Sequence, residues 1–277
     1  MFEEFKLYMQ TTGLSENSIK NYMVAMKGFY KFVRKNLKKV TLEDLDRYIR
    51  FLKKDKGYKN ATINLKVNAI KKYYTFLKRK GELSEESERV FLVKDLPTTK
   101  IKRTIITGEE VNELLNNPDL TRRQKCILAI LFQTGIRLSE LKNLNRDDFT
   151  LKQDYVVIDI KKTKSKRDRR VFMNYEYYKY VEEYISHSEG DALITKERNG
   201  ERLKTRQLGY VIESLSDNLD KRLTPHDYRA SCFTHLHRKG VDIYTISKIA
   251  GHSSIEITES YINEDEEDLS KALEAFK

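Results

Sequence analysis

The feature that most constrains the fold is a helical spacing of apolar residues that repeats through the first hundred positions. The first stripe follows Ser15, a suitable N-cap, and comprises Ile19, Tyr22, Met23, Met26, Phe29, Tyr30 and Val33. Such a stripe marks the buried face of an amphipathic helix. A second stripe follows the run TLED at 41–44, which resembles a capping box, and a third runs from its expected cap Asn60 to Gly81. The N-terminal third is therefore predicted to be a helical bundle.

Basic charge is concentrated in the same third of the chain. The whole chain has a formal net charge of +11, and residues 1–97 carry 22 Lys and Arg against 12 Asp and Glu. A solvated helix face usually mixes the two signs, so the excess favours contact with phosphates, although any single lysine there can be merely solvated. The candidate DNA-binding residues are Lys31, Lys35, Lys66, Lys71, Lys72, Lys100, Lys102 and Arg103.

Cysteine usage and hydropathy indicate the compartment. The chain has two cysteines, Cys126 and Cys232, which imply no disulfide framework. The N-terminal run MFEEFKLYMQ is unlike a signal peptide, and the longest apolar run, ILAILF at 127–132, is too short to span a bilayer. We therefore expect a cytoplasmic, nucleoid-associated protein with no membrane contact.

A segment without periodicity divides the chain. The run VKDLPTTKIKRT at 93–104 contains a proline and four basic residues, and we interpret its positions 94–104 as a linker between domains at 1–93 and 105–263. A basic linker would let two domains grip opposite sides of a duplex. Beyond it the pattern is mostly helical to about 261, with one helix closed by Gly135, and the run at 154–173 predicts a β-hairpin. The fold class is thus mainly α with a small β-hairpin or sheet.

Four stretches of the second domain carry side chains suited to chemistry. They are QTGIRLSEL with Arg137, the hairpin loop TKSKRDRR, TPHDYRASCFTHL with His226 and Arg229, and GHSSIEITESY with His252 and Tyr261. Each has an ordinary alternative, since Arg137 can pair with Glu140 on the surface, loop lysines can be solvated and a tyrosine can simply pack. A zinc site at Cys232, His235 and His237 is disfavoured, because on a helix the third residue turns away from the other two.

Taken together, the order and spacing of these residues resemble the active site of the tyrosine recombinases, or phage-integrase family, and are most similar to its Xer-type site-specific members. TGIRLSEL is similar to the first box of the family, and HDYR with AGHSSIEITESY to the second. KSKRDRRV aligns with the lysine-bearing hairpin and selects Lys164, although the missing turn glycines leave Lys162 and Lys166 open. Ala230 and Ala250 also depart from the residues common in the family.

The resemblance implies an architecture and a mechanism. It implies a helical, SAM-like core-binding domain followed by a catalytic domain, together forming a clamp on DNA. Tyr261 would be the nucleophile and His226 its base, with Lys164 as the general acid. The remaining residues would be Arg137, Arg229 and His252, which would stabilise the phosphorane-like transition state, and Glu140, which would orient Arg137. A 3′-phosphotyrosyl intermediate would form without metal, ATP or any other cofactor.

The C-terminal segment 264–277 differs in kind from the rest. The acidic run EDEED precedes LSKALEAF, whose apolar residues recur at helical spacing. Such a short helix either docks on its own domain or, as the family resemblance implies, passes to a neighbouring protomer in a homotetramer on two DNA duplexes.

The preferred function is site-specific recombination that resolves chromosome or plasmid multimers. No arm-binding domain is expected before the N-terminal helices, which favours this Xer-like role over a mobile-element integrase or excisionase of the same chemistry. A type IB topoisomerase and a non-catalytic DNA-binding relative are the further alternatives.

Overall fold

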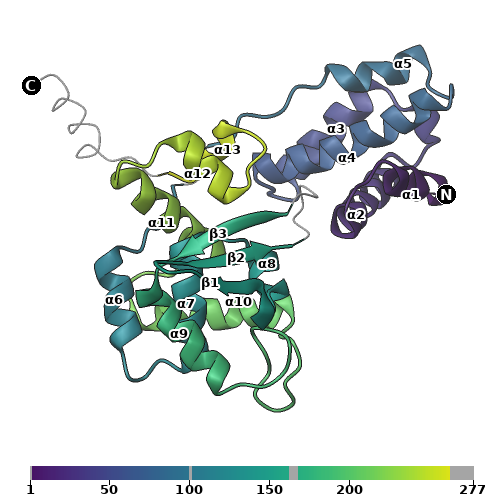
Figure 1. The fold of residues 1–277 in the computed structure, drawn as a ribbon. Helices are drawn as coiled ribbons and strands as arrows, with labels where there is room; N and C mark the ends of the chain where they lie inside the picture. Colours follow the sequence, from purple (N-terminus) through teal and green to yellow (C-terminus); the bar gives the residue numbers. More distant parts are fainter. Residues whose placement is uncertain (1, 100–101, 162–167, 263–277) are drawn as a thin grey trace, which may run out of the picture. The chain divides into compact units, whose positions relative to one another are not determined.

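In a computed structural model, the chain folds as two compact units, Met1–Lys100 and Ile101–Lys277 (Figure 1). The structure describes residues 2–99, 102–161 and 168–262. Each unit buries a hydrophobic cluster of its own, so each has an independent core. The division between them falls inside the aperiodic segment that the sequence marks as a linker.

The first unit is helical, as its apolar stripes predict. Its elements are α1 (Glu3–Thr11), α2 (Glu16–Val33), α3 (Leu42–Lys54), α4 (Asn60–Arg79) and the short α5 (Glu85–Glu88), with 3-10 turns at Leu37–Lys39 and Arg89–Leu92. Met26 and Phe29 of the α2 stripe are fully buried, and so are Ile63 and Ile70 of α4. The periodicity therefore identified the core-facing side of both helices.

Two of the three expected caps of this unit are confirmed, and one is wrong. Ser15 accepts from the Ser18 N–H, and Thr41 forms a complete capping box. Asn60 is not the cap of α4, because Lys59 holds that position and the Asn60 amide donates instead to the Pro97 carbonyl at 2.7 Å. The Asn60 side chain thus supplies a hydrogen-bond donor to a backbone carbonyl near the end of the first unit and does not cap the helix.

The second unit packs helices against a small three-stranded antiparallel sheet (Figure 1). Its elements are α6 (Gly108–Asn116), α7 (Arg122–Thr134), α8 (Leu138–Asn143), β1 (Phe149–Leu151), β2 (Val156–Ile160), β3 (Arg169–Met173), α9 (Tyr175–Ser186), α10 (Thr205–Ser214), α11 (Pro225–Arg238), α12 (Ile243–Ala250) and α13 (Ile255–Glu259), with 3-10 turns at Arg146–Asp148 and Leu215–Asn218. The hairpin of β2 and β3 is confirmed, and β1 adds a third strand that the sequence did not reveal. The chain between α9 and α10 is irregular, and helices α10 to α13 then continue to Glu259, as the mostly helical pattern to about 261 predicts.

Helix α7 is the centre of the second core and sets the position of the first candidate site residue. Ile127 to Leu131 are completely buried, which explains why the run ILAILF within this helix is apolar on every side. Gly135 ends it with φ +56°, and a Cβ there would lie 2.7 Å from the Phe233 ring. A glycine is therefore required at this turn, and it directs the chain into Arg137 at the start of α8.

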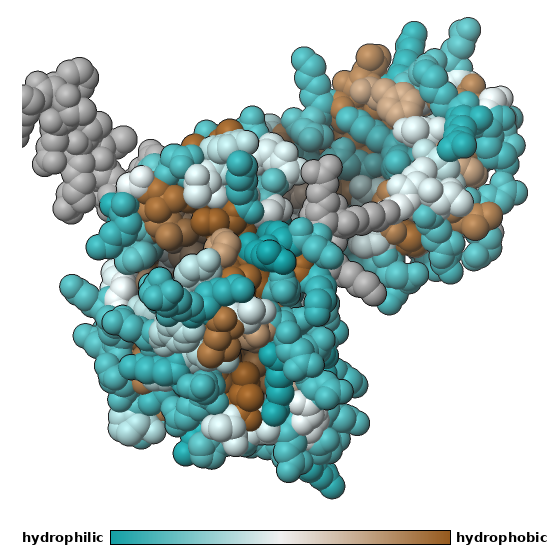
Figure 2. Space-filling view, viewed as in Figure 1, coloured by the Kyte–Doolittle hydropathy of each residue, from teal (hydrophilic) through white to brown (hydrophobic). Residues whose placement is uncertain are grey.

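The surface agrees with these amphipathic patterns. Figure 2 shows that the visible face of each unit is mostly hydrophilic, with scattered apolar patches. No described helix is long and apolar enough to cross a membrane.

Candidate active site

The C-terminal end of α12 gathers three cationic side chains. The carbonyls there each accept a hydrogen bond from a guanidinium, in three pairs: Ile249 with Arg169 (2.9 Å), Ala250 with Arg229 (2.7 Å) and Gly251 with Arg137 (3.1 Å). The last carbonyls of a helix have no partner within the helix and carry partial negative charge, so they are natural acceptors for cations. Residues from α8, β3 and α11 thereby converge on one helix end.

A buried carboxylate, Glu140, joins two of these arginines. Glu140 is the third residue of α8 and accepts from the Arg137 backbone N–H at 2.7 Å and from Arg137 Nη1 at 2.9 Å. Its two oxygens also accept a bidentate pair of hydrogen bonds, here called a fork, from Nη1 and Nη2 of Arg169 at 2.8 and 2.9 Å. Burial would raise the pKa of Glu140, but the hydrogen bonds and charges of Arg169 and Arg137 lower it to about 2. The pairing of Arg137 with Glu140 is thus internal to the site and not a surface contact.

Arg229 is the most deeply buried of the cations. It lies on α11 one turn after His226, with 1% of its surface exposed, and its guanidinium is 4.7 Å from the centroid of the Phe233 ring. Burial and the charge of Arg137 lower the pKa of Arg229, yet a guanidinium stays charged at neutral pH. Among the described residues of the cluster, Arg137, Arg169 and Arg229 carry three positive charges against one carboxylate, Glu140, which leaves an excess of two.

His252 follows the α12 turn and contacts the cluster directly. Its Nε2 lies 2.7 Å from Arg229 Nη2, and its Nδ1 lies 2.8 Å from the Thr258 hydroxyl. Because the guanidinium can only donate, we assign Nε2 as the acceptor and place the proton on Nδ1. Burial and the neighbouring arginines lower the pKa of His252 to about 3, so the imidazole is neutral at pH 7.

The phenol of Tyr261 lies against the same group of residues. Its Oη is 3.1 Å from His226 Nδ1, and its ring stacks on His252 with centroids 5.4 Å apart. The Arg229 guanidinium lies 5.6 Å from the Tyr261 ring centroid. Burial, followed by the charges of Arg103 and Arg229, lowers the pKa of His226, which leaves its ring free to accept a proton.

The structure therefore brings together most of the sequence-predicted site. Its members in one cluster are Arg137, Glu140, His226, Arg229, His252 and Tyr261. Lys164 lies outside the described residues, as do Lys162 and Lys166. Within the described ranges no group of three His, Cys, Asp or Glu side chains could hold a metal ion.

Sequence reasoning missed Arg169. It stands at the start of β3, in the same basic run that contains the candidate catalytic lysines. Alternate residues of a strand share a face, and Val171 and Met173 of β3 are buried. That alternation puts Arg169 on the inner side of the sheet and would have separated it from the exposed Arg170.

The candidate DNA-binding lysines of the first unit fall into two groups. Lys31 and Lys66 line one groove of about 710 Å³ between α2, α3 and α4, with Arg34, Lys56 and several aromatic rings. We call this the α2–α4 groove. The other three have partners elsewhere: Lys35 pairs with Asp44, Lys71 donates to the Val93 carbonyl and Lys72 lies over the Tyr8 ring. Of the linker residues, Lys102 is exposed, Arg103 half-buried, and Lys100 outside the described residues.

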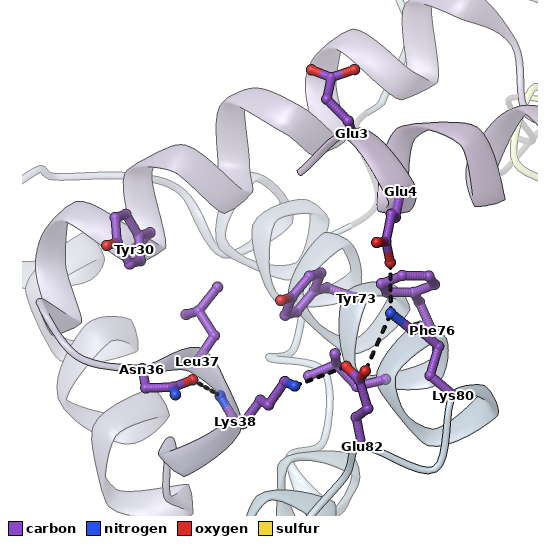
Figure 3. Close-up of a pocket in the computed structure, with 11 residues that line it drawn as sticks. Glu3, Glu4, Tyr30, Asn36, Leu37, Lys38, Tyr73, Phe76, Lys80 and Glu82 are labelled. Atoms are coloured by element: carbon purple, nitrogen blue, oxygen red, sulfur yellow. Dashed lines mark hydrogen bonds and ion pairs between the residues drawn. The ribbon is translucent and has the colours of Figure 1, made fainter. Parts of the chain in front are cut away.

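A second cavity of the first unit has the opposite character. It is a cleft of about 700 Å³. Figure 3 shows that four of its charged side chains point toward one another: Glu4, Lys80, Glu82 and Lys38. Lys80 contacts Glu4 at 2.6 Å and Glu82 at 3.2 Å, and Lys38 contacts Glu82 at 3.0 Å. These charges neutralise one another, so the network ties α1 to the turn after α4 and offers an anion little attraction.

The chain matches two family models that together cover most of its length. Residues 104–268 match the phage integrase family, and residues 1–81 match the phage integrase N-terminal SAM-like domain. Tyrosine recombinase XerA of Thermococcus kodakarensis is 31% identical over 288 aligned residues, covering 100% of this chain and 95% of that protein.

Two solved structures share the fold. The XerH site-specific recombinase bound to palindromic difH substrate in a post-cleavage complex has a TM-score of 0.76 and 20% identity, covering 92% of this chain and 78% of that one. A lambda integrase tetramer bound to a Holliday junction has a TM-score of 0.75 and 14% identity, covering 95% and 76%.

The chain belongs to the phage integrase family, whose members are also called tyrosine recombinases. The two units are accordingly its SAM-like N-terminal domain and its integrase domain. Within the family the chain is an Xer-type site-specific recombinase, an enzyme that exchanges DNA strands.

Proposed function

We propose that Tyr261 is the nucleophile of strand cleavage and that His226 accepts its proton. The Tyr261 Oη and His226 Nδ1 are 3.1 Å apart, within the range for general base catalysis, and we assign the hydroxyl as the donor. The phenolic oxygen attacks phosphorus while the bond from phosphorus to the 5′-oxygen breaks. The products are a 3′-phosphotyrosyl ester and a free 5′-hydroxyl.

Arg137 and Arg229 stabilise the charge that develops on the non-bridging oxygens. Both are held before the substrate arrives, Arg137 by Glu140 and Gly251 and Arg229 by Ala250, so little reorganisation accompanies the reaction. A phosphate that engages Arg229 would also release Nε2 of His252 from that guanidinium. His252 then becomes able to bind a proton and donate to the phosphate.

Lys164 is the proposed general acid for the leaving 5′-oxygen. The residue lies outside the described residues, and its role rests on the alignment of KSKRDRRV with the family hairpin. Because the phosphotyrosyl ester retains the energy of the broken bond, attack by a second 5′-hydroxyl rejoins DNA without ATP or a metal ion.

The contact between Tyr261 and His226 beside two fixed guanidinium groups is the observation that carries this mechanism. The mechanism is tested with a nicked duplex whose sequence the wild-type protein has selected from a randomised DNA library. The nick lets the short 5′ fragment diffuse away, which traps the phosphotyrosyl ester. Wild-type protein should accumulate a covalent adduct, and Tyr261→Phe should bind the duplex without forming one. A full yield of adduct from Tyr261→Phe would refute the assignment.

DNA is the proposed partner of both units. The α2–α4 groove combines four cations with aromatic rings, which suits contact with a nucleic-acid backbone. The related XerH and lambda integrase structures are bound to a difH substrate and to a Holliday junction, the latter as a tetramer. We extend this to a homotetramer on two duplexes, linked through residues 264–277.

The biological reaction that we propose is resolution of chromosome or plasmid multimers. A plasmid with two directly repeated copies of the selected site should be split into two circles by the protein alone. Recombination only between two different sites would instead indicate a mobile-element role, and relaxation of supercoils without strand exchange would contradict multimer resolution.

A further inference from the structure

Arg169 connects both sequence boxes of the active site through one guanidinium. Its Nη1 and Nη2 donate to the two oxygens of Glu140, and its Nε donates to the Ile249 carbonyl at 2.9 Å. Only 11% of the side chain is exposed, so the group has little room to reach a DNA phosphate. Its contacts are with the residues that hold the proposed catalytic groups.

The stem of Arg169 also lies directly against the turn that precedes His252. A Cβ at Gly251 would be 2.9 Å from Cδ of Arg169, and Gly251 adopts φ +62°. Both facts call for glycine at this position, so the turn and the arginine fit each other closely. Movement of Arg169 would therefore disturb the turn from which His252 projects.

The charges give Arg169 a specific task. Arg137 and Glu140 alone would form a neutral pair, and the carboxylate would hold the guanidinium by both hydrogen bonding and charge. The fork from Arg169 supplies a second cation to the same carboxylate. Arg137 can then direct its remaining donors and its charge outward, and 27% of its side chain is exposed.

We propose that Arg169 is a positioning residue that neutralises Glu140 and supports the Gly251 turn, so that Arg137 and His252 are free to face the scissile phosphate. This inference rests on the proposed function, because it gives Arg137 and His252 roles at that phosphate. A fork is needed, since only a guanidinium reaches two carboxylate oxygens and a carbonyl at once.

The test measures the single-turnover rate of adduct formation on the selected nicked duplex. Arg169→Ala should cleave about 100-fold more slowly, the loss that a displacement of ~1 Å produces in a catalytic group. Arg169→Lys should recover only part of the rate, because an ammonium cannot make the fork. The matched control is Arg170→Ala, which removes the neighbouring arginine of β3, a surface residue 72% exposed and paired with Asp159. It should cleave within about 2-fold of wild type.

A second substitution separates positioning from loss of folding. Glu140→Gln combined with Arg169→Ala removes the negative charge that Arg169 balances while keeping an acceptor for the Arg137 N–H. If Arg169 acts by neutralising Glu140, the double variant should cleave about 10-fold faster than Arg169→Ala alone. A purely structural role predicts no recovery, because the double variant has lost more contacts.

The outcomes distinguish this inference from the proposed function. A normal rate for Arg169→Ala, or a double variant no faster than Arg169→Ala alone, overturns the role of Arg169. The mechanism still stands in that case if Tyr261→Phe forms no adduct. Equal adduct yields from wild type and Tyr261→Phe overturn the mechanism and, with it, this inference.

Discussion

Glu140 and Glu82 each bind two cations, with different consequences. Glu140 of the integrase domain is 5% exposed and is held by Arg137 and Arg169. Glu82 of the SAM-like domain has 31% of its side chain exposed and is held by Lys38 and Lys80 (Figure 3). Both networks join separate segments of chain. The buried one uses planar guanidinium forks at a helix end, whereas the exposed one uses ammonium groups that water and salt screen.

This contrast explains how the active site preserves its positive charge. Burial makes every interaction of Glu140 stronger, and two arginines compensate for the cost of removing that carboxylate from water. The pKa of Glu82 is also lowered, by hydrogen bonds from Lys38 and Lys80, but the groups remain in contact with solvent. Substitutions in the two networks should therefore differ in the size of their effects.

The largest effect is expected on catalysis in the buried cluster. Arg229→Lys should slow strand cleavage by about 10²–10³-fold, because loss of one fixed donor to the developing charge costs that much. Lys80→Ala in the exposed network should leave the cleavage rate at the wild-type value. Single-turnover adduct formation on the selected nicked duplex measures both. Comparable losses in the two variants would remove the distinction between the networks.

The next effect concerns stability. Glu140→Ala removes the carboxylate that compensates the charges of three neighbouring guanidinium groups. It should therefore reduce the free energy of unfolding by about 3–5 kcal/mol. Glu82→Ala should leave the urea midpoint unchanged, because exposed ion pairs often contribute nothing measurable. Urea unfolding followed by circular dichroism gives both values. A larger loss in Glu82→Ala than in Glu140→Ala contradicts the comparison.

The pH dependence of stability should also differ. The pKa of Glu140 is about 2 in the folded protein against a usual value near 4.5. A lowered pKa means that the unfolded chain binds protons first, so the stabilisation is present above pH 4.5 and lost as pH falls toward 2. The loss is roughly 3 kcal/mol. Wild type and Glu140→Gln should therefore converge in stability across that window, and a constant difference would count against the low pKa.

The smallest effects are expected from the lysines of the SAM-like domain. Lys31→Ala and Lys66→Ala, in the α2–α4 groove, should each lower the slope of log Kd against log salt by about 1, as loss of one phosphate contact does. Lys35→Ala should leave the slope unchanged, because its ammonium pairs with Asp44. Fluorescence anisotropy at several salt concentrations measures the slopes. An unchanged slope in both groove variants would exclude this groove from the DNA interface.

Local sequence rules accounted for much of the fold. The α2 stripe, the Thr41 capping box and the Gly135 terminator depend on residues within one or two turns, so short-range patterns identify them. Asn60 was assigned wrongly because its partner, Pro97, is 37 positions away. Strand β1 escaped notice because three residues are too few for a visible alternation.

The residues of the candidate site that lie in motifs of fixed spacing could be predicted from the sequence. Arg137, His226, Arg229, His252 and Tyr261 stand in motifs of fixed order, and the structure places them in one cluster. The importance of Arg169 could not be seen in the same way. Strand alternation could place Arg169 on the inner face of the sheet. Its role depends on long-range contacts with Glu140 and Ile249, which no local pattern reveals.

The most direct test of the central claim is peptide mass spectrometry of the covalent adduct formed on the selected nicked duplex. The mechanism predicts a nucleotide 3′-phosphate esterified to Tyr261, a free 5′-hydroxyl on the released strand, and no adduct with Tyr261→Phe. A phosphate ester on a different residue, or a 5′-phosphate on the released strand, would contradict it.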